Sequence, residues 1–332
     1  MDVASYKFTE TVQEVDSSYQ GTMSDGTYKK FGDWPQTIKG NDIDIGSNTL
    51  TRGGFDYHVG SDGNYYVKAA EKAYGSGAGY QYTNGNDVGQ DGTSTQWFKV
   101  EPIVWRVLTE NYLVPGENGQ PVESGNSLLL AENILTGGIP YYVNTSSRTI
   151  GSATVYANNY KYSTIRAWLN GNEGSELKSD YKEGKGFLQT AFTDKALKCI
   201  AETTVDNTKE STFGRGEDQE DNPYACDNTT DKIFLLSEQE ATKEEYGFAE
   251  YIAYGKGNTR IRVTTDYAKA TGAYQDSTAG YGDWWWLRSP FYFFEDIVRR
   301  IDSDGYADSY FSFVYDCNGG VVPALSISMN GN

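Results

Sequence analysis

The chain has 332 residues, a formal net charge of −18 and only three cysteines. This charge disfavours nucleic acid as a partner, because nucleic-acid binding requires a basic surface that displaces phosphate counterions. So few cysteines exclude a disulfide scaffold. The sequence also contains no run of about 18 apolar residues that could span a bilayer. The 37 glycines and 27 tyrosines indicate many short strands joined by tight turns.

The N-terminal third predicts a hairpin followed by a long loop. Tyr57–Val59 and Asn64–Val67 flank Gly60-Ser61-Asp62-Gly63, whose Asp and Gly suit the positive φ angles of a tight turn. Segment 75–95 contains mostly Gly, Ser, Thr, Asn, Asp, Gln and Tyr, which predicts a loop. The only histidine, His58, lies beside the hairpin turn, and a lone histidine there favours a structural role.

The next segments predict two core strands and a turn between them. Segment 97–108 is apolar enough for a strand that continues past Pro102. Segment 127–132 is short and continuously apolar, as a buried central strand is. Segment 113–125 contains Pro and Gly and predicts a turn.

The middle of the chain adds helices, so we expect a single α+β domain over residues 1–332 with loop insertions. Ser163 caps a predicted helix that ends at Asn170-Gly171. A strand over 232–236 is followed by Ser237-Glu238-Gln239-Glu240, which matches a capping box. Segment 207–228 is polar and acidic, which predicts a surface insertion.

No residue set predicts a catalytic, cofactor or metal site. A Cys199–Cys226 bridge remains open, although a buried thiol is the favoured interpretation of Cys199. The Asp302–Asp308 segment is similar to a calcium loop, but its twelfth position is Phe313 instead of glutamate, so an Asp-Gly turn is favoured. A glycosidase pair could exist among the many carboxylates, and nothing singles one out.

The most distinctive stretch is Trp284-Trp285-Trp286-Leu287-Arg288-Ser289-Pro290. In a strand, Trp284 and Trp286 share one face, so the stretch predicts a core strand buried on both faces. We expect Arg288 to stack on one of the indoles.

The segment after Pro290 is aromatic without a helical or strand period. An exposed aromatic patch usually marks an interaction site, and Tyr mixed with Ser, Asp and Asn is typical of antibody-like binding surfaces. The alternative is that these rings belong to the core. The predicted ligand-binding residues lie within 291–318: Phe291, Tyr292, Phe293, Phe294, Asp296, Ile297, Arg300, Tyr306, Asp308, Ser309, Tyr310, Phe311, Phe313, Tyr315, Cys317 and Asn318.

Two motifs carry a resemblance to a known family. Trp285-Trp286-Leu287-Arg288-Ser289-Pro290, followed by a variable stretch and then Gly319-Gly320-Val321-Val322-Pro323-Ala324-Leu325, resembles the C-terminal signature of bacterial surface proteins. Segments 31–38, 97–108, 128–134, 233–241 and 261–270 also resemble treponemal members. Such proteins are similar to the variable proteins of diversity-generating retroelements. The resemblance implies a C-type lectin-like fold of the formylglycine-generating enzyme type.

In those systems, adenine-directed mutagenesis rewrites codons near the C-terminus, and the altered residues form the ligand-binding face. Adenine changes in AAC or AAT codons cannot produce Lys, Glu, Gln, Met or Trp. Segment 291–318 contains none of these except Glu295, which we therefore expect to be fixed. Cys317 is expected to be a product of mutagenesis.

We therefore expect a non-enzymatic, surface-displayed binder of a protein or other macromolecule, acting as a monomer without a cofactor. The resemblance implies a spirochaete lipoprotein anchored at the outer membrane, whose signal segment is absent from Met1–Glu10. Two alternatives remain. One is an enzyme of the formylglycine-generating or glycosidase type, although the cysteine pair of the former is not visible. The other is a structural envelope protein. Glu101-Pro102-Ile103 and Gln120-Pro121-Val122 differ from the calcium-lectin tripeptides, so lectin-type sugar binding is not expected.

Overall fold

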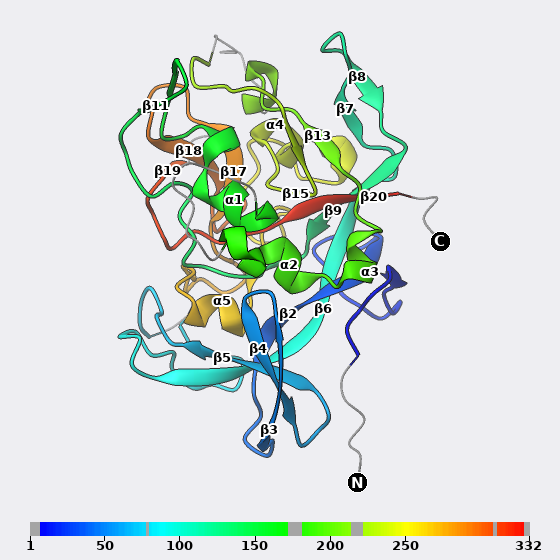
Figure 1. The fold of residues 1–332 in the computed structure, drawn as a ribbon, viewed down its shortest axis with the longest axis vertical. Helices are drawn as coiled ribbons and strands as arrows, with labels where there is room; N and C mark the ends of the chain where they lie inside the picture. Colours follow the sequence, from blue (N-terminus) through cyan, green and yellow to red (C-terminus); the bar gives the residue numbers. More distant parts are fainter. Residues whose placement is uncertain (1–6, 78–79, 172–180, 214–221, 308–310, 329–332) are drawn as a thin grey trace.

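The computed structural model describes residues 7–77, 80–171, 181–213, 222–307 and 311–328. Within them the fold is mixed α+β, mostly strands with short helices (Figure 1). The main sheet has nine antiparallel strands, and its long path runs β15-β20-β9-β6-β5-β4-β3, with β2 and β1 alongside β6. The strands are β1 (Gln13–Glu14), β2 (Tyr28–Ile38), β3 (Ile45–Arg52), β4 (Phe55–Gly60), β5 (Tyr65–Ala70), β6 (Thr95–Thr109), β9 (Asn126–Ala131), β15 (Ile233–Phe234) and β20 (Ala324–Ser328).

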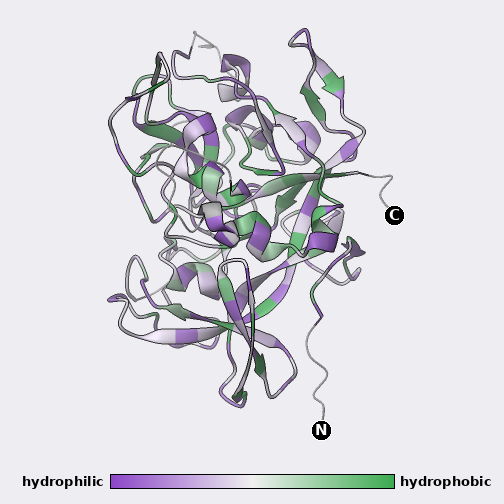
Figure 2. Cartoon of the chain, in the orientation of Figure 1, coloured by the Kyte–Doolittle hydropathy of each residue, from purple (hydrophilic) through white to green (hydrophobic). Residues whose placement is uncertain are grey.

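Strand β6 organises this sheet because it is long enough to pair with three other strands. Its first part pairs with β5, its last part with β9, and β2 runs along its other edge. Buried and more exposed residues alternate along most of β6, and Figure 2 shows hydrophilic and hydrophobic residues following one another along the strands of this sheet. The predicted strand past Pro102 is confirmed.

A second sheet of three antiparallel strands carries the C-terminal aromatic residues. It is formed by β17 (Trp285–Pro290), β18 (Ile297–Ile301) and β19 (Phe311–Phe313). Four two-stranded pairs complete the strands: β7 (Leu113–Pro115) with β8 (Pro121–Glu123), β10 (Asn133–Ile134) with β16 (Val263–Thr264), β11 (Arg148–Ile150) with β12 (Ala153–Val155), and β13 (Thr203–Val205) with β14 (Thr229–Asp231).

The α-helices are short and are fixed by their caps. They are α1 (Thr164–Asn170), α2 (Phe187–Ala191), α3 (Asp194–Leu197), α4 (Glu238–Ala241) and α5 (Asp266–Ala270). Ser163 caps α1, and Gly171 ends it at a φ of 68°, as predicted. Single helical turns lie at η1 (Tyr160–Tyr162), η2 (Tyr181–Lys185), η3 (Lys209–Thr212) and η4 (Glu244–Tyr246).

Several other predictions are confirmed. β4 and β5 form the predicted hairpin, with Gly63 at a φ of 79° in its turn. β9 is the predicted central strand, between β6 and β20. The capping box before α4 is formed by Ser237 and Glu240.

Two predictions are wrong. Segment 113–125 is a hairpin of β7 and β8, because Val114 pairs with Val122 and Gly119 supplies the left-handed turn residue. Segment 207–228 is not simply a surface insertion. In its described part, Asn207 and Asn222 are buried and donate hydrogen bonds, Asn207 to the Thr229 hydroxyl and Asn222 to the Pro290 carbonyl. A polar sequence can lie in the interior when its side chains satisfy buried groups.

Candidate functional site: the β17–β18–β19 aromatic face

The tryptophan strand β17 forms one edge of the second sheet, beside β18. Trp284, Trp285 and Trp286 are all buried, and the Trp284 and Trp286 rings meet edge to face at 4.8 Å, as expected for side chains on one face of a strand. A Cβ added at Gly319 would lie 2.5 Å from atoms of both rings. Gly319 is therefore required by the close approach of the C-terminal segment to this strand.

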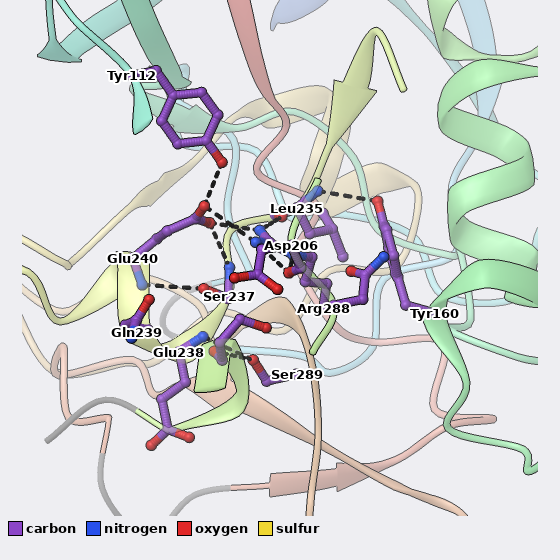
Figure 3. A network of polar contacts seen from close by, with 12 residues as sticks. Tyr112, Tyr160, Asp206, Leu235, Ser237, Glu238, Gln239, Glu240, Arg288 and Ser289 are labelled. Atoms are coloured by element: carbon purple, nitrogen blue, oxygen red, sulfur yellow. Dashed lines mark hydrogen bonds and ion pairs between the residues drawn. The ribbon is translucent and has the colours of Figure 1, made fainter. Parts of the chain in front are cut away.

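Arg288 does not stack on an indole, contrary to the prediction. It is buried and forms an ion pair with Glu240, with Nη1 2.5 Å and Nη2 3.1 Å from the carboxylate oxygens. Figure 3 shows this carboxylate also accepting from the Tyr112 hydroxyl, while Arg288 donates to the Asp206 and Leu235 carbonyls. Burial alone would raise the pKa of Glu240, but the charge and hydrogen bonds of Arg288 outweigh it and lower that pKa. The indole of Trp284 instead receives Arg300, whose guanidinium lies 4.7 Å from the ring centroid.

Along the opposite edge strand, β19, exposed and buried side chains alternate. In and just after β19, Phe311, Phe313 and Tyr315 are exposed, while Ser312 and Val314 between them are buried. Phe293 and Phe294 are exposed in the loop between β17 and β18. The exposed fractions of these five rings are 61% for Phe293, 54% for Phe294, 41% for Phe311, 44% for Phe313 and 46% for Tyr315. We call these five side chains the aromatic face.

The rings of this region contact one another. Phe291 stacks on Phe311 with centroids 4.5 Å apart, and Phe313 stacks on Tyr315 at 5.3 Å. Arg299 lies 4.8 Å from the Phe291 centroid, and its Nε pairs with the buried carboxylate of Glu238 at 3.2 Å. Phe291 and Arg299 are thus the inner layer on which the outer rings rest.

The backbone of the loop between β17 and β18 is held by one buried side chain. The Asn158 amide donates to the Phe294 carbonyl at 2.9 Å and to the Ile297 carbonyl at 3.1 Å. The Asn158 backbone N–H donates to the Glu295 carbonyl at 2.9 Å. Carbonyl groups are present whatever the side chain, so this loop keeps its anchors when its side chains change.

Backbone contacts hold the other end of the segment as well. The N–H groups of Tyr142, Gly138 and Tyr274 donate to the carbonyls of Val314, Cys317 and Asn318, at 2.8, 2.7 and 2.9 Å. The N–H of Val314 donates to the Asp296 carbonyl at 3.0 Å. Both ends of segment 291–318 are therefore attached to the fold largely through main-chain groups.

The sixteen predicted ligand-binding residues fall into four groups. Phe291 and Ile297 are buried and face inward. Tyr292, Asp296, Arg300, Tyr306 and Asn318 are half-buried. The aromatic face and Cys317 are exposed. Asp308, Ser309 and Tyr310 lie outside the described residues.

Sequence reasoning missed Asn158, Glu238 and Arg299. The role of Asn158 depends on a contact about 136 residues away along the chain, and nothing in the Ala157-Asn158-Asn159 sequence signals it. Glu238 was recognised only as a member of a capping box. The Glu238 backbone N–H also donates a hydrogen bond of 2.9 Å to the hydroxyl of Ser289, the residue after Arg288.

The described residues offer few groups for catalysis or metal binding. None of the three cysteines forms a disulfide, so Cys199 and Cys226 do not form the bridge that the sequence leaves open. Asp302–Gly305 is a tight turn, with Gly305 at a φ of 85° and its N–H donating to the Asp302 carbonyl. Among the described residues, no group of three or more His, Cys, Asp or Glu side chains could hold a metal ion, and no helix there is long and apolar enough to cross a membrane.

A family model described as a domain of unknown function (DUF6273) matches residues 124–329. This range includes α1, the whole second sheet and Asn158, and it leaves out β1 to β8. No curated protein and no solved structure matches the chain.

Proposed function

Since the chain belongs to the DUF6273 family, whose description states no function, we propose that it is a non-enzymatic binding protein that holds a macromolecule on its aromatic face. The observation that carries this proposal is the combination of five exposed rings with a segment attached through its backbone. Exposed aromatic clusters usually mark interaction sites, and rings contribute large contact areas at low entropic cost.

The proposal extends to how the face varies. The side chains of the aromatic face are those that adenine-directed mutagenesis can produce, and their replacement leaves the backbone anchors in place. We therefore propose that the chain is a retroelement-diversified variable protein with a C-type lectin-like fold, displayed on a bacterial outer surface by a lipid anchor. An unidentified protein is the expected ligand, bound by a monomer.

The enzyme alternative has less support. A glycosidase needs two carboxyl groups that converge on a substrate cleft. The two buried glutamates beside the second sheet, Glu238 and Glu240, instead form ion pairs with Arg299 and Arg288. Paired carboxylates of this kind favour a structural role.

A matched pair of displayed libraries tests the binding proposal. In the first, Phe293, Phe294, Phe311, Phe313 and Tyr315 are encoded by AAC-derived codons with both adenines randomised. We expect most members to fold and to yield binders against a model protein such as hen lysozyme. In the control library the same codons replace the buried Val298, Ile301 and Val314, and we expect most members to be lost from display.

Equal loss from the two libraries would contradict the proposal that the aromatic face varies freely. Folding without recovery of any binder would contradict the binding role. The retroelement origin has a separate test in the flanking DNA. We expect a reverse transcriptase gene and a near-copy of the 3′ end that differs only at adenines.

A further inference from the structure

A second candidate site lies beside the main sheet, outside the β17–β18–β19 sheet, where two arginines are completely buried. Arg106 lies in β6 and Arg262 directly precedes β16, and both are 0% exposed. Their Nη1 atoms donate to the same two oxygens. Arg106 Nη1 lies 3.2 Å from the Thr22 hydroxyl and 2.9 Å from the Thr259 carbonyl, and the corresponding distances for Arg262 are 3.3 and 3.0 Å. The two guanidinium groups are therefore neighbours in the interior.

The charges around this pair do not balance. Glu132 is the carboxylate whose charge acts on both guanidiniums, and it is itself buried. Its oxygens accept hydrogen bonds from the Thr22 backbone N–H at 2.6 Å and from the Thr22 hydroxyl at 3.2 Å. Burial and the Glu132 charge raise the pKa of the nearby Tyr19 hydroxyl, so Tyr19 is neutral at pH 7 and adds no negative charge. Two guanidiniums and one carboxylate leave one positive charge in the interior, which is costly without a counter-ion.

Loss of a proton does not remove this excess charge at neutral pH. Burial, and then the charge of Arg262, lowers the pKa of Arg106 to about 9. Burial also lowers the pKa of Arg262, and the charge of Glu132 opposes that shift. Both guanidiniums therefore keep their charge at pH 7.

The two guanidiniums also carry unpartnered hydrogen-bond donors. The Nε and Nη2 atoms of Arg106 and of Arg262 are buried and have no hydrogen-bond partner among the described residues. The Phe248 ring centroid lies 4.4 Å from the Arg106 Cζ, so this ring attracts the charge without satisfying the Nε and Nη2 donors. Buried N–H groups normally have acceptors. Water could accept from these donors, but only an anion would also balance the charge.

We propose that Arg106 and Arg262 together bind one compact monovalent anion of the chloride type. A single negative charge matches the excess of one positive charge, whereas a dianion such as sulfate would exceed it. The unpartnered Nε and Nη2 groups donate to the ion, and Thr22 and Glu132 hold the neighbouring Nη1 side of the site. The ion stabilises the fold where the segment around Thr22 meets β6 and Arg262. This site is independent of the aromatic face and of the function proposed for that face.

Thermal melts of the full chain in mixtures of sodium chloride and sodium gluconate test the site. Ionic strength stays constant while chloride increases, so general screening does not change. We expect the melting temperature to rise by several degrees and to follow a saturation curve, because an ion that binds only the folded state stabilises it by mass action. In crystals grown with sodium bromide, we expect an anomalous-scattering peak within hydrogen-bond distance of both Arg106 and Arg262.

Variants then test the assigned residues. Arg262→Met leaves Arg106 balanced by Glu132, so the saturable dependence on chloride should disappear. Arg148→Met is the matched control, because Arg148 also lies against a ring, that of Tyr142, and should leave the dependence intact.

The proposal is overturned if chloride gives the parent no saturable rise in melting temperature, or if Arg262→Met keeps the parent's dependence. Bromide crystals without a peak at the two arginines would overturn it as well, and they decide the matter if Arg262→Met does not fold.

Discussion

Two aromatic stretches lie close together in the chain, yet their side chains have opposite environments. Trp284, Trp285 and Trp286 are buried, whereas most rings between Phe293 and Tyr315 are exposed. The difference comes from what covers each strand. β17 lies beneath the Gly319–Gly320 segment and beside α4, while no described element covers the outer face of β19. Aromatic content alone therefore does not distinguish core from surface.

The stretches also differ in how they are attached. β17 depends on particular side chains, above all Arg288 with Glu240. Segment 291–318 depends largely on backbone groups. If this contrast is correct, substitutions in β17 should lower the free energy of unfolding strongly, and substitutions on the aromatic face should change it little.

The largest effect is expected from Arg288→Met. It leaves the buried carboxylate of Glu240 without its partner, which should lower the free energy of unfolding by about 3–5 kcal/mol. Guanidinium unfolding measures this loss. The double variant Arg288→Met/Glu240→Gln removes both charges and should recover part of it. A loss under about 1 kcal/mol for the single variant would show that the ion pair does not hold β17.

A smaller loss is expected from Asn158→Ala. It removes the donor to the Phe294 carbonyl and one of the two donors to the Ile297 carbonyl, which keeps the Phe291 N–H, and this should cost about 1–3 kcal/mol. Hydrogen exchange should also rise at the amides of 292–297. Asn144→Ala, at an exposed asparagine, is the control and should change stability by under about 0.5 kcal/mol. Unchanged exchange in the loop would mean that other contacts hold it.

The contrast also has a pH dependence. Asp283, directly before the tryptophan strand, is fully buried, and burial raises the pKa of its carboxyl well above the usual range. Between the unfolded pKa of about 3.9 and this raised value, the folded state binds the additional proton. The stability that the protonated Asp283 carboxyl contributes to the folded state is therefore fully present below about pH 3.9. It is lost as the pH rises through the raised pKa.

Asp283→Asn removes that pH-dependent loss. We expect the variant to be more stable than the parent at pH 7, with the difference shrinking as pH falls toward 4. Thermal melts across this range measure the difference. A variant that is less stable than the parent at pH 7 would show that the ionised carboxylate is stabilised in the fold.

The smallest effect is expected on the aromatic face itself. Phe313→Ser and Phe293→Ser should each change the free energy of unfolding by about 1 kcal/mol or less, because 44% and 61% of these residues' surface is already exposed. Phe291→Ser, at a buried ring of the same kind, should cost about 3 kcal/mol or more and serves as the matched comparison. Equal losses at all three positions would remove the distinction between an inner and an outer layer.

The sequence predicts local features well where one stretch contains the whole cause. Ser163 and Gly171 predict the ends of α1 because capping depends on residues within one turn. The alternation of Trp284 and Trp286 predicts a shared buried face for the same reason. The β7–β8 hairpin was missed because Val114 and Val122 are isolated apolar residues among turn formers.

The candidate sites were predictable only in part. The composition of 291–318 singles out the segment, but it does not separate the inward Phe291 and Ile297 from the outward rings, because that depends on register with β18 and β19. The sequence favours an indole as the partner of Arg288 because the nearest rings in the chain are tryptophans, whereas its actual partner, Glu240, is 48 residues away. The rings of Trp34 and Tyr267 meet edge to face although the two residues are over 230 positions apart in the chain, and no local pattern predicts such a contact.

The position of Asn158 has a consequence for how such a molecule can change over generations. Because Asn158 binds carbonyl groups of the main chain, a new side chain at the exposed positions Phe293 and Phe294 should change the folding equilibrium little. If the proposed diversification occurs at these positions, the variants would have similar melting temperatures while differing in what each one binds. Selection could then act on affinity alone, without the usual trade between a new function and a stable fold.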